Sequence, residues 1–151
     1  MRSTSSPESV LVALGSNLGD RTRNLRRAVG ALREVISVVR VSSMHETEPV
    51  DAPIGSPLFL NMVVAGYTTL SPEDLLRTLQ EIEQRHGRVR RGRNAPRTID
   101  IDLILHSANL RRSPDLTLPH PRYLQREFVM APLRELHLAW FDPVSGKKLG
   151  G

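Results

Sequence analysis

The stretch PRTIDIDLIL, residues 96–105, alternates apolar and acidic side chains and so decides one strand of the fold. Successive side chains of a β-strand point to opposite faces, so Asp100 and Asp102 share one face of this strand. The apolar residues beside them point the other way, and we expect three to anchor the strand in the core: Ile99, Ile101 and Leu103. The segment therefore predicts a strand over residues 98–106 with a carboxylate pair on one side.

This carboxylate pair needs positive charge nearby. Two like charges about 7 Å apart repel each other, and their partial burial is costly unless a cation neutralises them. Magnesium prefers carboxylate oxygens together with water and phosphate ligands, so the pair is a candidate site for Mg²⁺ with a nucleotide. The alternative is a salt-bridged surface in which Arg97 or Arg88 is the partner of the two aspartates.

Arginines are concentrated just before this strand. Guanidinium groups match phosphate oxygens well, and six of them fall within residues 85–97: Arg85, Arg88, Arg90, Arg91, Arg93 and Arg97. A solvated basic loop is the simpler alternative. The chain has only three Phe, two Tyr and one Trp, too few for the stacking platforms of single-stranded nucleic-acid binders. We therefore expect a small phosphorylated ligand and no nucleic-acid partner.

The length of 151 residues suits one compact domain and is too short for two ordinary ones. We expect a disordered leader at residues 1–8 and a single domain at residues 9–151. The sequence has no cysteine, which excludes disulfides, thiolate metal sites and thiol nucleophiles. No apolar run reaches the roughly 18 residues of a membrane span, and the leader has no apolar core. We therefore expect a cytoplasmic protein that has no contact with a membrane.

Hydrophobic periodicity predicts the following elements: strands at residues 10–14, 38–45, 59–68 and 98–106, helices at 20–36 and from the N-cap Ser71 to near Gly87, and a short helix at 128–137 that contains Pro132. The helix after Ser71 should bury a stripe made of Leu75, Leu76, Leu79 and Ile82. This order predicts an α+β fold that resembles a ferredoxin-like sandwich, a mainly antiparallel sheet with helices packed on it. We expect flexible loops at residues 46–57 and 87–95 to close over a nucleotide.

The segment GSNLGD, residues 15–20, follows the first strand but lacks the Gly-Lys-Ser/Thr ending of a Walker A loop. Its glycines suit a turn between a strand and a helix, where backbone conformations with positive φ are needed. Any nucleotide site in this chain is therefore built in another way.

Several motifs, taken in order along the chain, resemble those of one enzyme family. They are LGSNLG at residues 14–19, FLN at 59–61, GRVR at 87–90, PRTIDID at 96–102 and LPH at 118–120. Together they resemble 6-hydroxymethyl-7,8-dihydropterin pyrophosphokinase of folate biosynthesis, and the match runs from about residue 10 to about residue 136. The resemblance implies transfer of a diphosphate from ATP to the hydroxymethyl group of the reduced pterin, with release of AMP.

The resemblance also implies roles for individual residues. Asp100 and Asp102 would bind two Mg²⁺ ions and would form the catalytic set together with Arg88 and Arg97. The residues that bind ATP, the co-substrate, would be Gln80, Glu83, Arg88, Arg90, Arg97, Leu103, Thr117, His120 and Arg126. The pterin pocket would consist of Thr47, Val50, Phe59, Asn61 and Phe128, with two aromatic faces against the flat ring system.

One departure from the family concerns the loop before PRTIDID, which often carries an aromatic residue that closes over the pterin. Here the matching segment reads GRNA, residues 92–95, in which Asn94 can form hydrogen bonds but cannot stack as an aromatic ring does. The departure leaves the carboxylate pair untouched.

Two other functions stay open when the residues are considered without the resemblance. A ferredoxin-like domain could bind RNA or DNA through the arginine-rich loop, with steep salt dependence and no need for Mg²⁺. A metal-dependent phosphohydrolase could use the same aspartates with water as the nucleophile. We expect a monomeric enzyme, and release of AMP from ATP with and without the pterin separates the three functions.

Overall fold

The computed structural model describes residues 6–48, 53–86 and 98–150. Its elements, in chain order, are β1 (Glu8–Ser16), α1 (Arg21–Leu32), β2 (Ser37–Val41), β3 (His45–Thr47), β4 (Phe59–Thr68), α2 (Pro72–Arg85), β5 (Asp100–His106), β6 (Arg111–Arg112), β7 (Thr117–Leu118), the 3₁₀ helix η1 (Tyr123–Gln125) and α3 (Glu127–Arg134).

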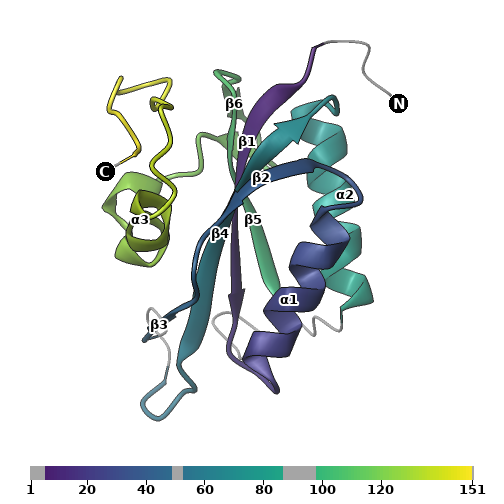
Figure 1. Cartoon of the computed structure of the whole chain (residues 1–151), viewed down its shortest axis with the longest axis vertical. Coiled ribbons are helices and arrows are strands. Elements are labelled where there is room, and N and C mark those ends of the chain that lie inside the picture. The colour runs from purple at the N-terminus through teal and green to yellow at the C-terminus, as the bar shows by residue number, and fades with distance from the viewer. Residues whose placement is uncertain (1–5, 49–52, 87–97, 151) are drawn as a thin grey trace.

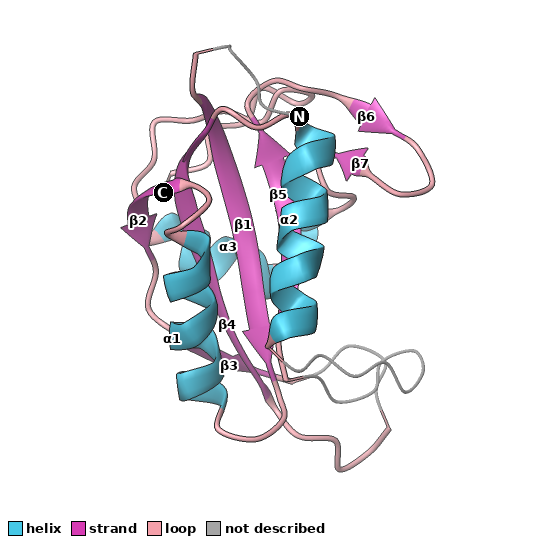
Figure 2. Ribbon diagram, turned by 90° about the vertical axis from the view of Figure 1, so that its right-hand side faces the viewer, coloured by secondary structure: helices cyan, strands magenta, loops and turns pink. Residues whose placement is uncertain are grey.

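The main sheet has the strand order β2-β4-β1-β5, and β3 also pairs with β4 (Figure 1). Every pair in it is antiparallel, and β1 lies in the middle between β4 and β5. This confirms the predicted α+β fold with a ferredoxin-like order of strands and helices. A second small sheet, β6 with β7, lies beside α2 (Figure 2) and was not expected from the sequence.

Helices cover the main sheet on both faces. Helices α1 and α2 lie on one face and α3 lies on the other (Figures 1 and 2). The side chains of β1 alternate between two cores, because Val10, Val12 and Leu14 pack toward α1 and α2 while Leu11 packs toward α3. A strand that is buried on both faces has a continuous apolar sequence, which explains the run VLVAL at residues 10–14.

A register shift in β5 sets which of its side chains face the cores. Leu11 pairs with Leu105 but Val12 pairs with Leu103, so Ile104 is an extra residue in β5. Before the shift, Ile99, Ile101 and Leu103 are buried in the core of α1 and α2, as the alternation predicted. The intervening carboxylates of Asp100 and Asp102 are only half-buried, on the opposite face of the strand.

Several predicted boundaries differ from the structure. Helix α1 ends at Leu32 rather than at residue 36, and β5 begins at Asp100 rather than at residue 98. The predicted strand 38–45 is two strands, because at Ser42 the side chain replaces a backbone acceptor: its hydroxyl oxygen accepts from the Val63 N–H at 2.9 Å. The predicted loop 46–57 therefore begins after β3, and the final helix runs from Glu127 to Arg134 without a break at Pro132.

Both long helices begin where side-chain capping predicts. The Ser71 hydroxyl accepts a hydrogen bond from the Asp74 N–H at 3.1 Å, and Pro72 occupies the first helical position. Asp20 caps α1 in the same way, through the Arg23 N–H. The predicted leader at residues 1–8 remains a prediction for residues 1–5, which lie outside the described residues, while Glu8 is already part of β1. None of the described helices is long and apolar enough to span a bilayer.

Candidate active site

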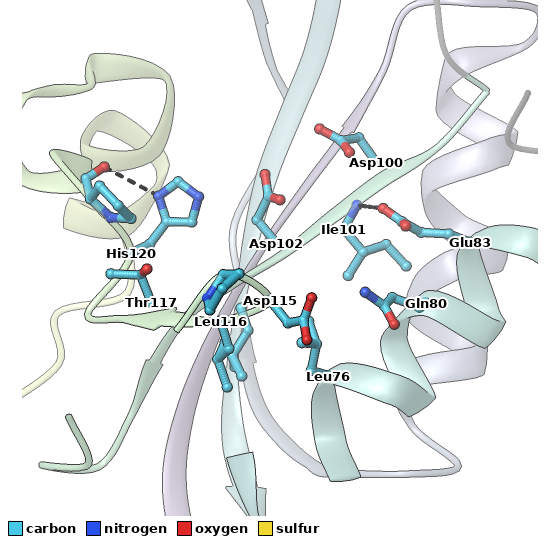
Figure 3. Close-up of a pocket in the computed structure, with 13 residues that line it drawn as sticks. Leu76, Gln80, Glu83, Asp100, Ile101, Asp102, Asp115, Leu116, Thr117 and His120 are labelled. Carbon is cyan, nitrogen blue, oxygen red and sulfur yellow. Dashed lines mark hydrogen bonds between the residues drawn. The ribbon is translucent and has the colours of Figure 1, made fainter. Parts of the chain in front are cut away.

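A cleft of about 400 Å³ runs along the outer edge of β5, between α2 and the segment 114–121 (Figure 3). It is lined by Leu76, Gln80, Glu83, Asp100, Ile101, Asp102, Leu103, Pro114, Asp115, Leu116, Thr117, His120 and Pro121. The tertiary structure thus brings together both predicted metal-binding aspartates and five of the predicted ATP-binding residues: Gln80, Glu83, Leu103, Thr117 and His120.

The carboxylates of Asp100 and Asp102 point into this cleft from the same face of β5 (Figure 3). Carboxylate oxygens are hard ligands that suit Mg²⁺, so the chemistry of the pair fits the predicted ion. Within residues 6–48, 53–86 and 98–150, no group of three or more His, Cys, Asp or Glu side chains could hold a metal ion. An ion held by the pair would therefore depend on oxygens from a bound phosphate and from water.

A third carboxylate in the cleft, Glu83 of α2, has a different role in the structure. Its side chain is buried, with a residue exposure of 7%, and one oxygen accepts a hydrogen bond from the Ile101 N–H at 2.7 Å. Ile101 lies between the two aspartates, so this contact ties α2 to the edge strand where the carboxylate pair is. Gln80 lies one helical turn before Glu83 and lines the same cleft, as the i, i+3 spacing predicted.

The opposite wall of the cleft is formed by Thr117 and His120 (Figure 3). The backbone N–H of His120 donates to the carbonyl of Ile104 at 2.9 Å, which attaches this wall to β5. Burial lowers the pKa of the His120 ring, and the charge of Arg126 acts in the same direction. The lowered pKa favours the neutral imidazole, whose Nδ1 donates to the Pro121 carbonyl at 3.2 Å and leaves Nε2 for a ligand.

Arg126, predicted to contact ATP, is not among the residues that line the cleft. It immediately precedes α3, and its guanidinium carbon lies 5.6 Å from the centre of the Phe128 ring. Arg126, a predicted ATP-binding residue, is therefore in contact with Phe128, a predicted pterin-binding residue.

The described pterin-pocket residues gather at one end of the sheet, on the face that α3 covers. The Asn61 amide donates to the Thr47 hydroxyl, and Phe59 is two residues before Asn61 on the same face of β4. In the strand register, Asn61 pairs with Gly15 and Gly15 pairs with Asp100. The Cα atoms of Asn61 and Asp100 are therefore about 10 Å apart, two strand spacings, and the residue between them has no side chain.

Gly15 leaves space between these functional groups. A methyl group at this position would lie 3.0 Å from the Asn61 amide oxygen and 3.3 Å from the Phe59 ring. Glycine thus keeps this part of the sheet surface open beside the carboxylate pair. The fourth described member of the set, Phe128, comes from α3 and packs against the core on this face.

Some predicted site residues lie outside the described residues: Arg88, Arg90 and Arg97 of the arginine-rich segment, Val50, and Asn94 of the predicted lid. Sequence reasoning also missed residues that line the cleft. Asp115 is in the same cleft as Gln80 (Figure 3), and its position two residues before Thr117 was the only signal for it. Leu76 was predicted in the buried stripe of α2 but is only half-buried, because it faces the cleft.

Comparison with known proteins gives matches over most of the chain. The family model of 7,8-dihydro-6-hydroxymethylpterin-pyrophosphokinase matches residues 11–138. The chain is 44% identical over 127 residues to the 2-amino-4-hydroxy-6-hydroxymethyldihydropteridine pyrophosphokinase of Bacillus subtilis, covering 83% of this chain and 75% of the relative. It is 40% identical over 139 residues to the enzyme of the same name from Porphyromonas gingivalis, covering 89% of this chain and 93% of the relative.

The fold is also found in solved structures. A Plasmodium falciparum HPPK-DHPS triple mutant crystallised with SDX-DHP superposes with a TM-score of 0.74 at 14% sequence identity. The superposition covers 97% of this chain and 44% of the Plasmodium chain, so this chain spans less than half of that protein.

The fold and the names of the relatives define the class of this protein as an α+β transferase. The chain belongs to the 7,8-dihydro-6-hydroxymethylpterin-pyrophosphokinase family. It is a diphosphotransferase of folate biosynthesis that uses ATP as co-substrate and a pterin as acceptor, as the resemblance implied. The assigned activity is diphosphate transfer, which sets aside the phosphohydrolase alternative.

Proposed function

We propose that ATP binds in the cleft along β5 and that the pterin binds beside it, at the end of the sheet near Gly15. The observation that carries this proposal is the carboxylate pair, Asp100 and Asp102, which faces a cleft that also contains the side chains of His120, Gln80 and Thr117. In the strand register Asp100 is the neighbour of Gly15, so the two binding regions share a border.

In this proposal Asp100 and Asp102 would hold two Mg²⁺ ions. When bound, Mg²⁺ supplies positive charge to the phosphate oxygens. The residues of the chain bind and orient the substrates: Arg88 and Arg97 neutralise phosphate charge, and Gln80, Thr117 and His120 contact the nucleotide. Orientation is the main contribution that a protein makes to phosphoryl transfer, because the transition state needs little covalent assistance.

The pterin would lie between the rings of Phe59 and Phe128, with Asn61 and Thr47 as hydrogen-bonding groups at its edge. Its hydroxymethyl oxygen forms a bond to the β-phosphorus of ATP, the bond from that phosphorus to the α,β-bridging oxygen breaks, and AMP leaves. The hydroxyl proton goes to solvent. We also propose that the enzyme acts as a monomer in the cytoplasm, and light scattering of the purified protein tests the monomer.

The assay that tests the proposed activity measures AMP release from ATP with and without 6-hydroxymethyl-7,8-dihydropterin, each with Mg²⁺ and with EDTA. We expect AMP only when both pterin and Mg²⁺ are present, together with stoichiometric pterin diphosphate. AMP release without pterin would show hydrolysis instead of transfer. Equal turnover in EDTA would contradict the role given to the metal ions.

A further inference from the structure

A hydrogen bond between two buried side chains, Tyr123 and Asp142, links the C-terminal segment to the domain. Their exposed fractions are only 2% and 3%. The Tyr123 hydroxyl donates to one carboxylate oxygen of Asp142 at 2.6 Å. The other oxygen accepts from the backbone N–H groups of Val144 and Ser145 at 3.1 and 2.7 Å. Both oxygens of this buried carboxylate therefore have partners, which is the condition for burying the group.

Asp142 comes from a part of the chain that the family match, residues 11–138, does not include. The segment around it forms a closed turn, because the Asp142 N–H donates to the Lys147 carbonyl at 2.8 Å and the Gly146 N–H donates to the Asp142 carbonyl at 2.9 Å. This turn lies near α3 at the C-terminal end of the chain (Figure 1). The backbone of this turn therefore fixes the Asp142 carboxylate independently of the hydrogen bond to Tyr123.

Tyr123, the donor of this hydrogen bond, lies in η1 between His120 and Arg126, the two residues proposed to contact ATP. Its backbone N–H donates to the His120 carbonyl at 3.5 Å, and its carbonyl accepts from the Arg126 N–H at 3.1 Å. The His120 N–H is in turn bonded to β5. A displacement of Tyr123 therefore moves the backbone of both His120 and Arg126.

We propose that Asp142 and Tyr123 are positioning residues, and that their hydrogen bond holds His120 and Arg126 in the orientation that binds ATP. The inference rests on the proposed function, in which His120 and Arg126 contact the nucleotide. Pterin binding is assigned to other residues, two of which, Phe59 and Asn61, are in β4 on the far side of β1. A third pterin residue, Phe128, lies next to Arg126, with its ring centre 5.6 Å from the guanidinium carbon. Loss of the hydrogen bond is therefore expected to weaken ATP binding more than pterin binding.

The positioning role of Tyr123 can be tested by a substitution that keeps its ring. It packs in the core with Val129, Met130 and Leu133, so Tyr123→Phe keeps the apolar contacts and removes only the hydroxyl. We expect this variant to raise KM for ATP about fivefold, with kcat and KM for the pterin within about twofold of wild type. The Kd of a non-hydrolysable ATP analogue with Mg²⁺, measured by calorimetry, should increase by a similar factor.

Two variants of Asp142 separate positioning from loss of packing. Asp142→Asn keeps a hydrogen-bonding group opposite the tyrosine hydroxyl and should stay close to wild type, while Asp142→Ala should raise KM for ATP as Tyr123→Phe does. Because Asp142→Ala already removes the partner of the tyrosine hydroxyl, the double variant Tyr123→Phe/Asp142→Ala should have the same KM for ATP as Asp142→Ala alone. If Asp142→Ala does not fold, Tyr123→Phe alone decides.

The controls are Tyr67→Phe, which removes the hydroxyl of the other tyrosine, and Val29→Ala in α1, which lowers stability from the opposite core. An unchanged KM for ATP in Tyr123→Phe would overturn the inference. An equal rise in KM for ATP and in KM for the pterin would also overturn it, because the effect would then not be specific to the nucleotide. Wild-type enzyme without pterin-dependent AMP release would instead contradict the proposed function, so the two failures are distinguishable.

Discussion

At the scale of single residues, the three carboxylates on β5 and α2 differ in what surrounds them. Glu83 is buried and accepts the Ile101 N–H, whereas Asp100 and Asp102 are half-buried and face the cleft. A buried acid bound to a backbone amide serves the structure, and acids at the border of an open cleft can bind an ion together with a phosphate. Removing the Glu83 side chain should therefore affect stability, whereas removing the charge of Asp100 or Asp102 should affect activity.

Replacing either aspartate with asparagine should abolish turnover without unfolding the protein. Asp100→Asn and Asp102→Asn keep the size of the side chain but remove the negative charge that would hold Mg²⁺. We expect kcat to fall at least about 100-fold, because charge stabilisation at the phosphates is lost. AMP release measures the effect, and an unchanged circular dichroism spectrum confirms the fold. Wild-type activity in either variant would disprove its assignment as a metal ligand.

Gly15 is a second residue whose substitution is informative. Gly15→Ala places a methyl group within 3.0 Å of the Asn61 amide oxygen, so the wall of the proposed pterin pocket must shift. We expect a higher KM for the pterin and little change in KM for ATP, both from steady-state kinetics. Gly30→Ala in α1 is the matched control, because nothing lies within 4 Å of the added methyl. That control should gain about 0.5–1 kcal/mol of stability. Equal pterin KM values in the two variants would contradict the pocket.

At the scale of elements, the junction of α2 with β5 shapes the cleft. Edge strands carry unpaired backbone groups on their outer side, and Glu83 satisfies one of them at Ile101. The same helix supplies Gln80 and Leu76 to the cleft. This hydrogen bond, together with the core packing of α2, holds the nucleotide side of the cleft next to the carboxylate pair.

Glu83→Ala should destabilise the protein and also reduce its activity. It leaves the Ile101 N–H without its partner, at a cost of about 1–3 kcal/mol, and releases the strand between the two aspartates. Glu83→Gln keeps an oxygen acceptor and should retain more of both properties. Urea denaturation and AMP release measure the two effects. A Glu83→Ala variant as stable as Glu83→Gln would show that the hydrogen bond to Ile101 is unimportant.

At the scale of the whole molecule, the sheet separates two cores, and the C-terminal segment closes the one on the α3 side. Trp140 and Leu149 of this segment pack in that core, and Asp142 bonds to Tyr123. Burial by itself raises the pKa of Asp142, but the hydrogen bonds from Tyr123, Ser145 and Val144 outweigh it and hold the pKa below its usual value of 3.8. The charged form is therefore the one that the folded protein favours.

A lowered pKa in the folded state makes stability depend on pH in one direction. The stabilisation from Asp142 is fully present above its unfolded pKa of about 3.8 and is lost as the pH falls through the lower folded value. We expect the Tm of wild type to fall between about pH 5 and pH 2 more steeply than that of Asp142→Asn, which cannot titrate. Differential scanning calorimetry at a series of pH values tests this. Parallel curves for the two proteins would contradict it.

Some elements of the fold could be predicted from the sequence and others could not. Strand β4 and the start of α2 were predicted to the residue, because alternation and capping are local properties of the chain. The short strands β6 and β7 were missed, since two-residue strands have no periodicity to detect. The break between β2 and β3 depends on a hydrogen bond from Val63, twenty-one positions away from Ser42, which no local pattern contains.

The sequence by itself determined the order of elements, the direction of the side chains in β5 and, through its motifs, the family and its activity. Only the tertiary structure showed that Glu83 binds the amide between the aspartates, that Gly15 opens space between Asn61 and Asp100, and that Asp142 holds Tyr123. The physical reason is the distance along the chain over which each interaction acts. Alternation, capping and turn preferences act between neighbours along the chain, whereas burial and hydrogen bonding join residues that meet only after the sheet and its helices have packed together.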